Sequence, residues 1–83
     1  MDLIARTPQQ LGAVIRRRRK QAGLSQQDLG SKIRLRQATI SKLESGEPAT
    51  RLQTLLDVLA ALELELVVRP RTKGSTASLE DIF

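Results

Sequence analysis

The residues whose chemistry stands out lie in the stretch LRQATISKLESG, residues 35–46. It has the length of a short helix, and Leu35, Ile40 and Leu43 can supply its buried side. The other side carries amide, hydroxyl and cationic groups, from Arg36, Gln37, Thr39, Ser41 and Lys42. Any polar residues would keep a helix hydrated, whereas this set can also form hydrogen bonds with a surface of donors and acceptors. The edges of the base pairs in a DNA groove are such a surface.

Gln37 has the most specific hydrogen-bonding capacity in this stretch, because a glutamine amide both accepts from and donates to an adenine edge. Ala38 is short enough to approach a thymine methyl group, and Ser41 lies one turn after Gln37 on the same face. We therefore expect contacts with DNA bases from Gln37, Ala38 and Ser41, with Arg36 flanking them. The alternative is that Gln37 is only a solvated surface residue.

Contacts with DNA phosphates are expected around the same helix, from Gln26, Arg34, Thr39 and Lys42. Gln26 opens the preceding helix, where backbone amides also point at phosphate. Lys42 could equally be a solvated charge, and Thr39 could instead pack and cap.

The sequence offers little for catalysis or for a cofactor. It contains no cysteine and no histidine, which removes the usual metal ligands, the usual general base and the cysteine nucleophile. The acidic residues are scattered and form no cluster with metal-ligand spacing. We therefore expect a protein that is not an enzyme and that holds no cofactor; a small nuclease is the weakest alternative.

The charge of the chain is unevenly distributed. Residues 1–73 hold all fourteen Lys and Arg and seven acids, whereas residues 74–83 hold two acids and no base. A basic body suits a polyanion such as DNA, although basicity also aids solubility. The run RRRRK at 16–20 is weak evidence, because such runs are usually one solvated helix face. The single aromatic residue, Phe83, argues against a platform that stacks single-stranded bases.

The first ten residues lack the basic and apolar regions of a signal peptide, and no stretch approaches the roughly 20 apolar residues of a membrane span. A cytoplasmic protein without a membrane partner is the expectation.

The elements that must position these residues begin with two helices. A capping box is predicted at Thr7-Pro8-Gln9-Gln10, where it begins a helix that ends at Gly23. A second helix begins at Ser25 with Asp28 in its first turn, where an acid suits the helix dipole.

A third helix is predicted from about Gln37 to Glu44, ending at Gly46, and a fourth from a capping box at Thr50-Arg51-Leu52-Gln53. Its apolar stripe consists of Leu52, Leu55, Leu56, Leu59 and Leu62.

The second and third helices are short and are separated by a tight turn at 34–36. Gly30 lies near the middle of the pair, where a small residue lets the second helix cross closely. This arrangement predicts a helix-turn-helix, whose second helix enters the major groove by its N-terminal end. The predicted fold class is mainly α, with four to five helices.

The stretch Glu63–Arg69 has period two and ends before Pro70, which predicts one C-terminal β-strand. The chain contains no second strand, so the simplest partner is the same strand of a second copy, antiparallel across a two-fold axis. We expect a homodimer that binds an inverted-repeat DNA site. The strand residues expected at this interface are Leu64, Leu66, Val67 and Val68. The alternative is a frayed extended segment.

Two regions are expected: residues 1–73 for DNA binding and dimerisation, and a flexible tail at 74–83.

Residues 11–62 resemble the Xre/Cro-type helix-turn-helix family, through AGLSQQDLGSKI, the SKLESG of the third helix and the leucine helix that follows. More narrowly, RQATISKLES followed by LAALELELVV resembles the HipB-type antitoxins. The resemblance places Arg36, Gln37, Ala38 and Ser41 on DNA-contacting positions and Gln26 on a phosphate-contacting one.

The resemblance also concerns three arginines. It implies that Arg19 pairs internally with Glu44, although a phosphate contact is the alternative. Arg34 departs from the family, which usually has glycine there, and a left-handed turn at a non-glycine residue costs roughly 1 kcal/mol. Arg18 stands where the family is usually apolar, so we expect its stem to pack and its head to reach water.

HipB-type antitoxins act with a kinase toxin, and a C-terminal tail with a terminal aromatic residue can dock on that kinase. The resemblance therefore implies a dimeric repressor that restrains a HipA-type kinase and autoregulates its operon, with Ile82 and Phe83 in the docking tail. The tail could instead be disordered or feed proteolysis. The alternative function is a free-standing phage-like repressor without a toxin.

Overall fold

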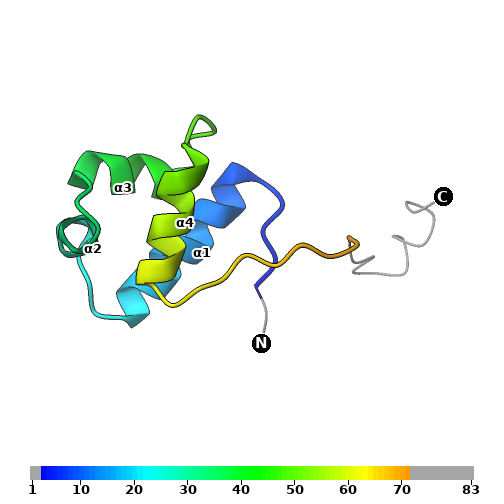
Figure 1. Ribbon diagram of the computed structural model, residues 1–83, viewed down its shortest axis with the longest axis horizontal. Coiled ribbons are helices and arrows are strands. Elements are labelled where there is room, and N and C mark those ends of the chain that lie inside the picture. Colours follow the sequence, from blue (N-terminus) through cyan, green and yellow to red (C-terminus); the bar gives the residue numbers. More distant parts are fainter. Residues whose placement is uncertain (1–2, 72–83) are drawn as a thin grey trace.

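The computed structural model describes residues 3–71, which fold into four helices (Figure 1). They are α1 (Pro8–Gln21), α2 (Gln26–Lys32), α3 (Gln37–Glu44) and α4 (Leu52–Ala61). The predicted mainly α helix-turn-helix fold is confirmed, and no fifth helix occurs within this part of the chain. The predicted tail residues Ile82 and Phe83 lie outside the described residues.

The first two helices begin with side-chain caps. Thr7 Oγ1 accepts from the backbone N–H of Gln10 at 3.0 Å, as predicted. The side chain of Gln10, however, accepts from the backbone of Arg6 at 2.6 Å, so only half of the predicted capping box forms. At α2 the box is complete, with Ser25 and Asp28 each accepting from the backbone N–H of the other, at 2.9 and 3.0 Å.

The capping box predicted at Thr50 is wrong. The residue that caps α4 is Arg51, which makes no side-chain capping bond. Thr50 instead donates to the backbone carbonyl of Glu47 at 3.2 Å, and Gln53 donates to Asp57 at 2.8 Å. Because the helix begins one residue later than predicted, Gln53 does not occupy the third helical position that a box requires.

All four helices contribute to one core. Its fully buried side chains include Ile15 of α1, Leu29 of α2, Ile40 of α3 and Val58 of α4. The leucine stripe predicted for α4 is confirmed in part: Leu59 and Leu62 are buried and Leu55 is half-buried, but Leu52 and Leu56 are 65% and 38% exposed.

The helix α1 approaches α3 unusually closely at Gly12. A Cβ atom on Gly12 would lie 2.4 Å from the carbonyl oxygen of Glu44 and 2.6 Å from that of Leu43. Gly30 has a similar role, because its Cβ would lie 2.5 Å from the carbonyl oxygen of Leu35 in the turn. These two glycines set how tightly α1 and the turn can pack against their neighbours.

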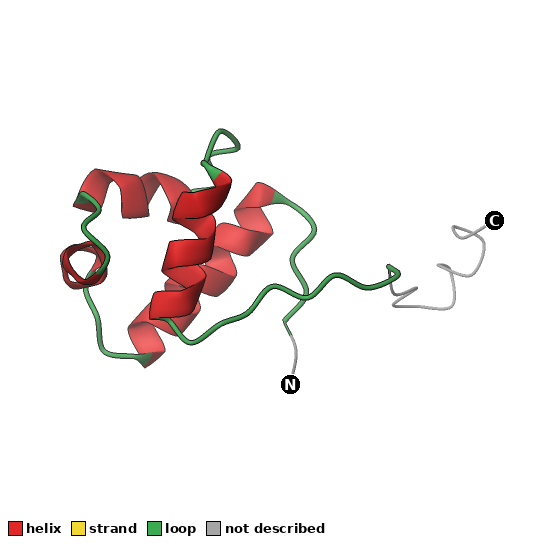
Figure 2. Ribbon diagram, viewed as in Figure 1, coloured by secondary structure: helices red, strands yellow, loops and turns green. Residues whose placement is uncertain are grey.

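The segment after α4 runs away from the helices without regular secondary structure as far as residue 71 (Figure 2). The predicted strand at 63–69 is thus not formed within the described part of this single chain. A β-strand is defined by backbone hydrogen bonds to a neighbouring strand, and the described part of this single chain contains no such neighbour. Pairing between two copies therefore stays a prediction. Leu64 differs from the other three predicted interface residues, because it is half-buried and packs against the core of its own chain.

Among the helices within residues 3–71, none has the length and apolar composition needed to cross a membrane.

Candidate nucleic-acid interface

The turn between α2 and α3 is held by the backbone. The N–H of Leu35 donates to the carbonyl of Gly30 at 2.8 Å, and Arg34 adopts a left-handed conformation with φ of 59°. The family's usual glycine would adopt this conformation without strain, whereas a side chain there costs roughly 1 kcal/mol. The turn nevertheless keeps its shape, which directs the N-terminal end of α3 outward.

The exposed side of α3 brings the predicted base-contacting residues together. Ile40 and Leu43 are buried on one side of the helix, and the residues expected to contact bases are exposed on the other. These are Arg36, Gln37, Ala38 and Ser41. Among the predicted phosphate-contacting residues, Arg34 and Lys42 are exposed, whereas Gln26 and Thr39 are half-buried and less accessible.

A buried ion pair joins α1 to the end of α3. Arg19 donates to both carboxylate oxygens of Glu44, from Nε at 2.6 Å and from Nη2 at 3.0 Å, and Nη1 donates to the carbonyl of Leu24 at 2.7 Å. Arg19 is 7% exposed and Glu44 is 9% exposed. The predicted internal pair is confirmed, and because every guanidinium nitrogen has an acceptor, it is favoured over the alternative phosphate contact.

The hydrogen bonds from Arg19 to Glu44 also affect the ionisation of the Arg19 guanidinium. They raise the pKa of Arg19 above its ordinary value, although burial acts in the opposite direction. Arg19 therefore stays charged, and its guanidinium lies against the buried carboxylate of Glu44.

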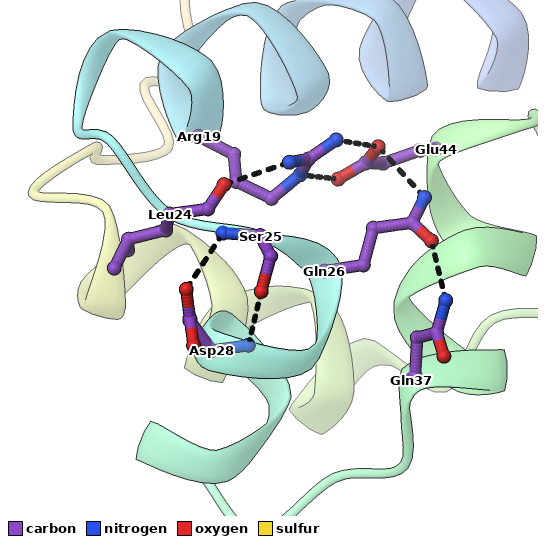
Figure 3. Close-up of polar contacts among 7 residues, drawn as sticks. All are labelled: Arg19, Leu24, Ser25, Gln26, Asp28, Gln37 and Glu44. Carbon is purple, nitrogen blue, oxygen red and sulfur yellow. Dashed lines mark hydrogen bonds and ion pairs between the residues drawn. The ribbon is translucent and has the colours of Figure 1, made fainter.

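The polar contacts continue from this ion pair to the first residue of α3 (Figure 3). Glu44 Oε1 accepts from Gln26 Nε2 at 3.2 Å, and Gln26 Oε1 accepts from Gln37 Nε2 at 3.2 Å. A carboxylate can only accept, so Gln26 must turn its NH₂ group to Glu44 and its oxygen to Gln37. Gln37 then keeps its Oε1 and one N–H for an outside partner.

The sequence does not reveal this connection. It predicts Gln26 only as a phosphate contact, and the structure adds that Gln26 supports Gln37, a residue eleven positions later in the chain. The usable signal is the placing of two glutamines at the first positions of consecutive short helices, whose starts the turn brings together.

Arg18 fulfils its expectation in part. Its side chain is half-buried, with 38% exposed, and its head binds the end of α4: Nε donates to the carbonyl of Leu62 at 3.0 Å, and Nη2 lies 3.8 Å from the carboxylate of Glu63. A cation at the C-terminal end of a helix satisfies carbonyls that the helix leaves unpaired.

Across residues 3–71, no three acidic side chains gather closely enough to hold a metal ion.

Residues 15–68 of this chain match the sequence pattern of the helix-turn-helix family. The protein named Antitoxin HipB from Escherichia coli (strain K12) is 35% identical over 74 residues, which cover 89% of this chain and 84% of that protein. Antitoxin HipB from Escherichia coli O6:H1 is 34% identical over 74 residues, covering 89% of this chain and 79% of that protein.

Solved structures agree with this similarity. A HipB variant in complex with a 20mer named O2 superposes with a TM-score of 0.80 at 32% identity, covering 87% of this chain and 100% of that one. The HipB chain in a HipA–HipB–O2–O3 complex gives a TM-score of 0.77 at 33% identity, covering 83% of this chain and 97% of that one.

Proposed function

This chain belongs to the helix-turn-helix family and is a HipB antitoxin-like DNA-binding protein. From this premise, we propose that it acts as a dimeric repressor and as the antitoxin of a HipA-type kinase. It binds an inverted-repeat operator and thereby regulates its own operon. One observation supports the proposed DNA binding most directly: Gln37 is exposed at the start of α3, and its amide is hydrogen-bonded to Gln26.

The contacts proposed with DNA follow from the geometry of α3. Gln37 offers an acceptor, Oε1, and a donor, Nε2, on one amide group, which matches the edge of an adenine. Arg36 and Ser41 extend the same exposed face, and Ala38 leaves room for a thymine methyl group. Lys42 and Arg34 carry exposed cations on either side for phosphates.

The dimer is supported by the segment after α4. Leu66, Val67 and Val68 are 57%, 63% and 91% exposed in a single chain, which is unfavourable for consecutive apolar side chains. An antiparallel pairing with the same segment of a second copy would cover them and supply backbone hydrogen bonds. The α3 helices of the two copies would then face one side of the DNA.

The kinase partner is supported by the relatives rather than by a contact. A HipA–HipB–O2–O3 complex is among the similar solved structures. This chain matches most of the length of the HipB proteins. We propose that Ile82 and Phe83 contribute to binding the kinase, with the aromatic ring as the main anchor.

The proposed function is tested in two measurements on the full chain. DNA selected from the region upstream of its gene should be shifted by the protein, should contain an inverted repeat, and should outcompete scrambled DNA by a large factor. The product of the neighbouring gene, if it is a HipA-type kinase, should co-purify with the protein. Equal affinity for selected and scrambled DNA contradicts the repressor, and specific DNA binding without such a kinase supports a free-standing repressor instead.

A further inference from the structure

The basic run at 16–20 divides into three parts in the structure. Arg19 is buried in the ion pair with Glu44, and Arg18 binds the end of α4. The remaining cations are Arg16, Arg17 and Lys20, which we call the α1 basic patch. They are exposed, and their side chains make no hydrogen bond or ion pair with any residue of the described part of the chain.

The α1 basic patch lines an open hollow of about 450 Å³ together with Ala13, Gln21 and Glu44. Ala13 is the only apolar side chain of this lining, and Glu44 is already neutralised by Arg19. The hollow therefore presents three positive charges that no other acidic residue of its lining compensates. A surface of this kind fits anionic oxygens better than an apolar side chain.

The hollow lies beside the residues that connect the Arg19–Glu44 ion pair to Gln37. Glu44 forms part of its wall, and the same carboxylate accepts from Gln26 at the start of α2, whose oxygen accepts from Gln37 (Figure 3). Along α3, Gln37, Ser41 and Glu44 are spaced by four and three residues, so they follow one side of the helix. The α1 basic patch thus adjoins the side from which α3 presents its base-contacting residues.

We propose that the α1 basic patch binds the DNA phosphate backbone outside the base pairs contacted by α3. This inference rests on the proposed DNA binding and extends its footprint. When α3 enters a major groove, the start of α2 faces the flanking backbone, and α1 adjoins that point. Arg16, Arg17 and Lys20 then contact phosphates that neither α2 nor α3 reaches, which adds affinity without base specificity.

The test is the salt dependence of DNA binding by the full chain. The variant R16Q/R17Q/K20Q should bind a long operator duplex at least tenfold more weakly at physiological salt. The slope of log affinity against log salt should fall by about 0.9 for each phosphate that the variant no longer neutralises. The charge-preserving R16K/R17K should keep the wild-type slope. K32Q is the control for loss of a cation elsewhere on the surface, because Lys32 lies at the C-terminal end of α2, in a separate hollow that Asp57 also lines.

A second experiment uses duplexes that are trimmed at their outer ends, so that they keep only the base pairs covered by the α3 helices of the two copies. On these, R16Q/R17Q/K20Q and the wild type should bind with the same slope. Equal slopes on the long duplex as well would overturn the proposal, as would an equal reduction in affinity on both duplexes. Weakened kinase binding with an unchanged DNA slope would also overturn it, in favour of a protein surface. Circular dichroism melts of each variant show whether it is folded.

Failure of the proposed function gives a different result. A wild-type protein that fails to distinguish operator from scrambled DNA contradicts the repressor, whereas the patch is judged by the slope, which is measurable on either sequence.

Discussion

Gln37 donates from its side-chain Nε2 to Oε1 of Gln26 across 3.2 Å, so the first side chain of α3 is already oriented in the DNA-free protein. Gln26 is in turn held by Glu44, which the buried Arg19 fixes in place. A side chain ordered before binding loses less conformational entropy when it binds. The ion pair inside the domain thus stabilises the geometry of the surface that we propose to read DNA.

The first prediction concerns Gln37→Ala. Removing the amide should cost roughly 1–3 kcal/mol of binding free energy on the operator and should leave binding to scrambled DNA unchanged. Gel shifts on both sequences check this. Lys42→Ala is the control, since removal of a phosphate-binding cation weakens both sequences alike and flattens the salt dependence. Equal weakening by Gln37→Ala on both sequences would rule out a base contact.

The sequence predicted the parts of the fold that depend on local patterns. The four helices follow from caps, apolar periodicity and the spacing of the helix pair, whereas the left-handed turn at Arg34 was expected only from the family resemblance. The start of α4 was misplaced because Thr50 and Gln53 imitate a capping box that tertiary packing does not use. Of the two predicted capping boxes, the one at Thr7 forms in half and the one at Thr50 does not form, whereas the complete box at Ser25 was predicted only as a helix start.

The contacts that sequence reasoning missed join residues far apart in the chain. The approach of Gly12 to the carbonyl of Glu44 leaves no periodic signal, because a helical glycine can be present for several reasons. The hydrogen bond from Arg18 to Leu62 spans 44 residues and follows from where α4 ends. The Arg19 pair could be expected only from family resemblance, since five consecutive basic residues do not reveal which one points inward.

The second prediction concerns the buried ion pair. Glu44→Gln leaves the Arg19 guanidinium buried without its counter-charge, so it should destabilise the domain by about 3–5 kcal/mol. The control is Glu63→Gln, because Glu63 is 3.8 Å from Arg18 with 86% of its side chain exposed, and such pairs contribute about 0–1 kcal/mol. Urea unfolding of both variants measures the difference. Similar midpoints for the two would show that burial adds nothing to the Arg19 pair.

The third prediction concerns Gly12→Ala. In an unobstructed helix this change would stabilise by about 1 kcal/mol. Here the new Cβ would meet the backbone oxygen of Glu44 at 2.4 Å, so α1 and α3 must separate, and overpacking of this kind costs about 1–3 kcal/mol. Thermal unfolding should show clear destabilisation. Gly23→Ala is the control with open space, where only the positive φ of 74° costs about 1 kcal/mol. A stabilised Gly12→Ala protein would mean that the helices are not in contact there.

The fourth prediction concerns Arg34→Gly. Relief of the left-handed conformation at φ 59° should stabilise the domain by about 1 kcal/mol. The same change removes a cation proposed to contact phosphate, so DNA affinity should fall on every sequence while stability rises. Denaturant midpoints and the salt slope measure the two effects separately. Glu63→Gly, at φ 57°, should relieve the same conformation, less the about 0–1 kcal/mol of its pair with Arg18, without the fall in DNA affinity. A rise in stability with unchanged affinity in Arg34→Gly would remove Arg34 from the DNA contacts.

The last prediction concerns the dimer. Leu66, Val67 and Val68 remain exposed after the chain has folded, and pairing with a second copy would bury them. Val67→Pro removes one backbone donor and blocks a paired strand, so light scattering should report monomers and a half-site should be bound only weakly. Arg71→Pro is the matched control, because it places the same residue beyond the expected strand at 63–69 and should leave the dimer intact. Dissociation by both variants would mean that proline disturbs the segment generally. A wild-type protein that stays monomeric at micromolar concentration would exclude strand pairing as the basis of assembly.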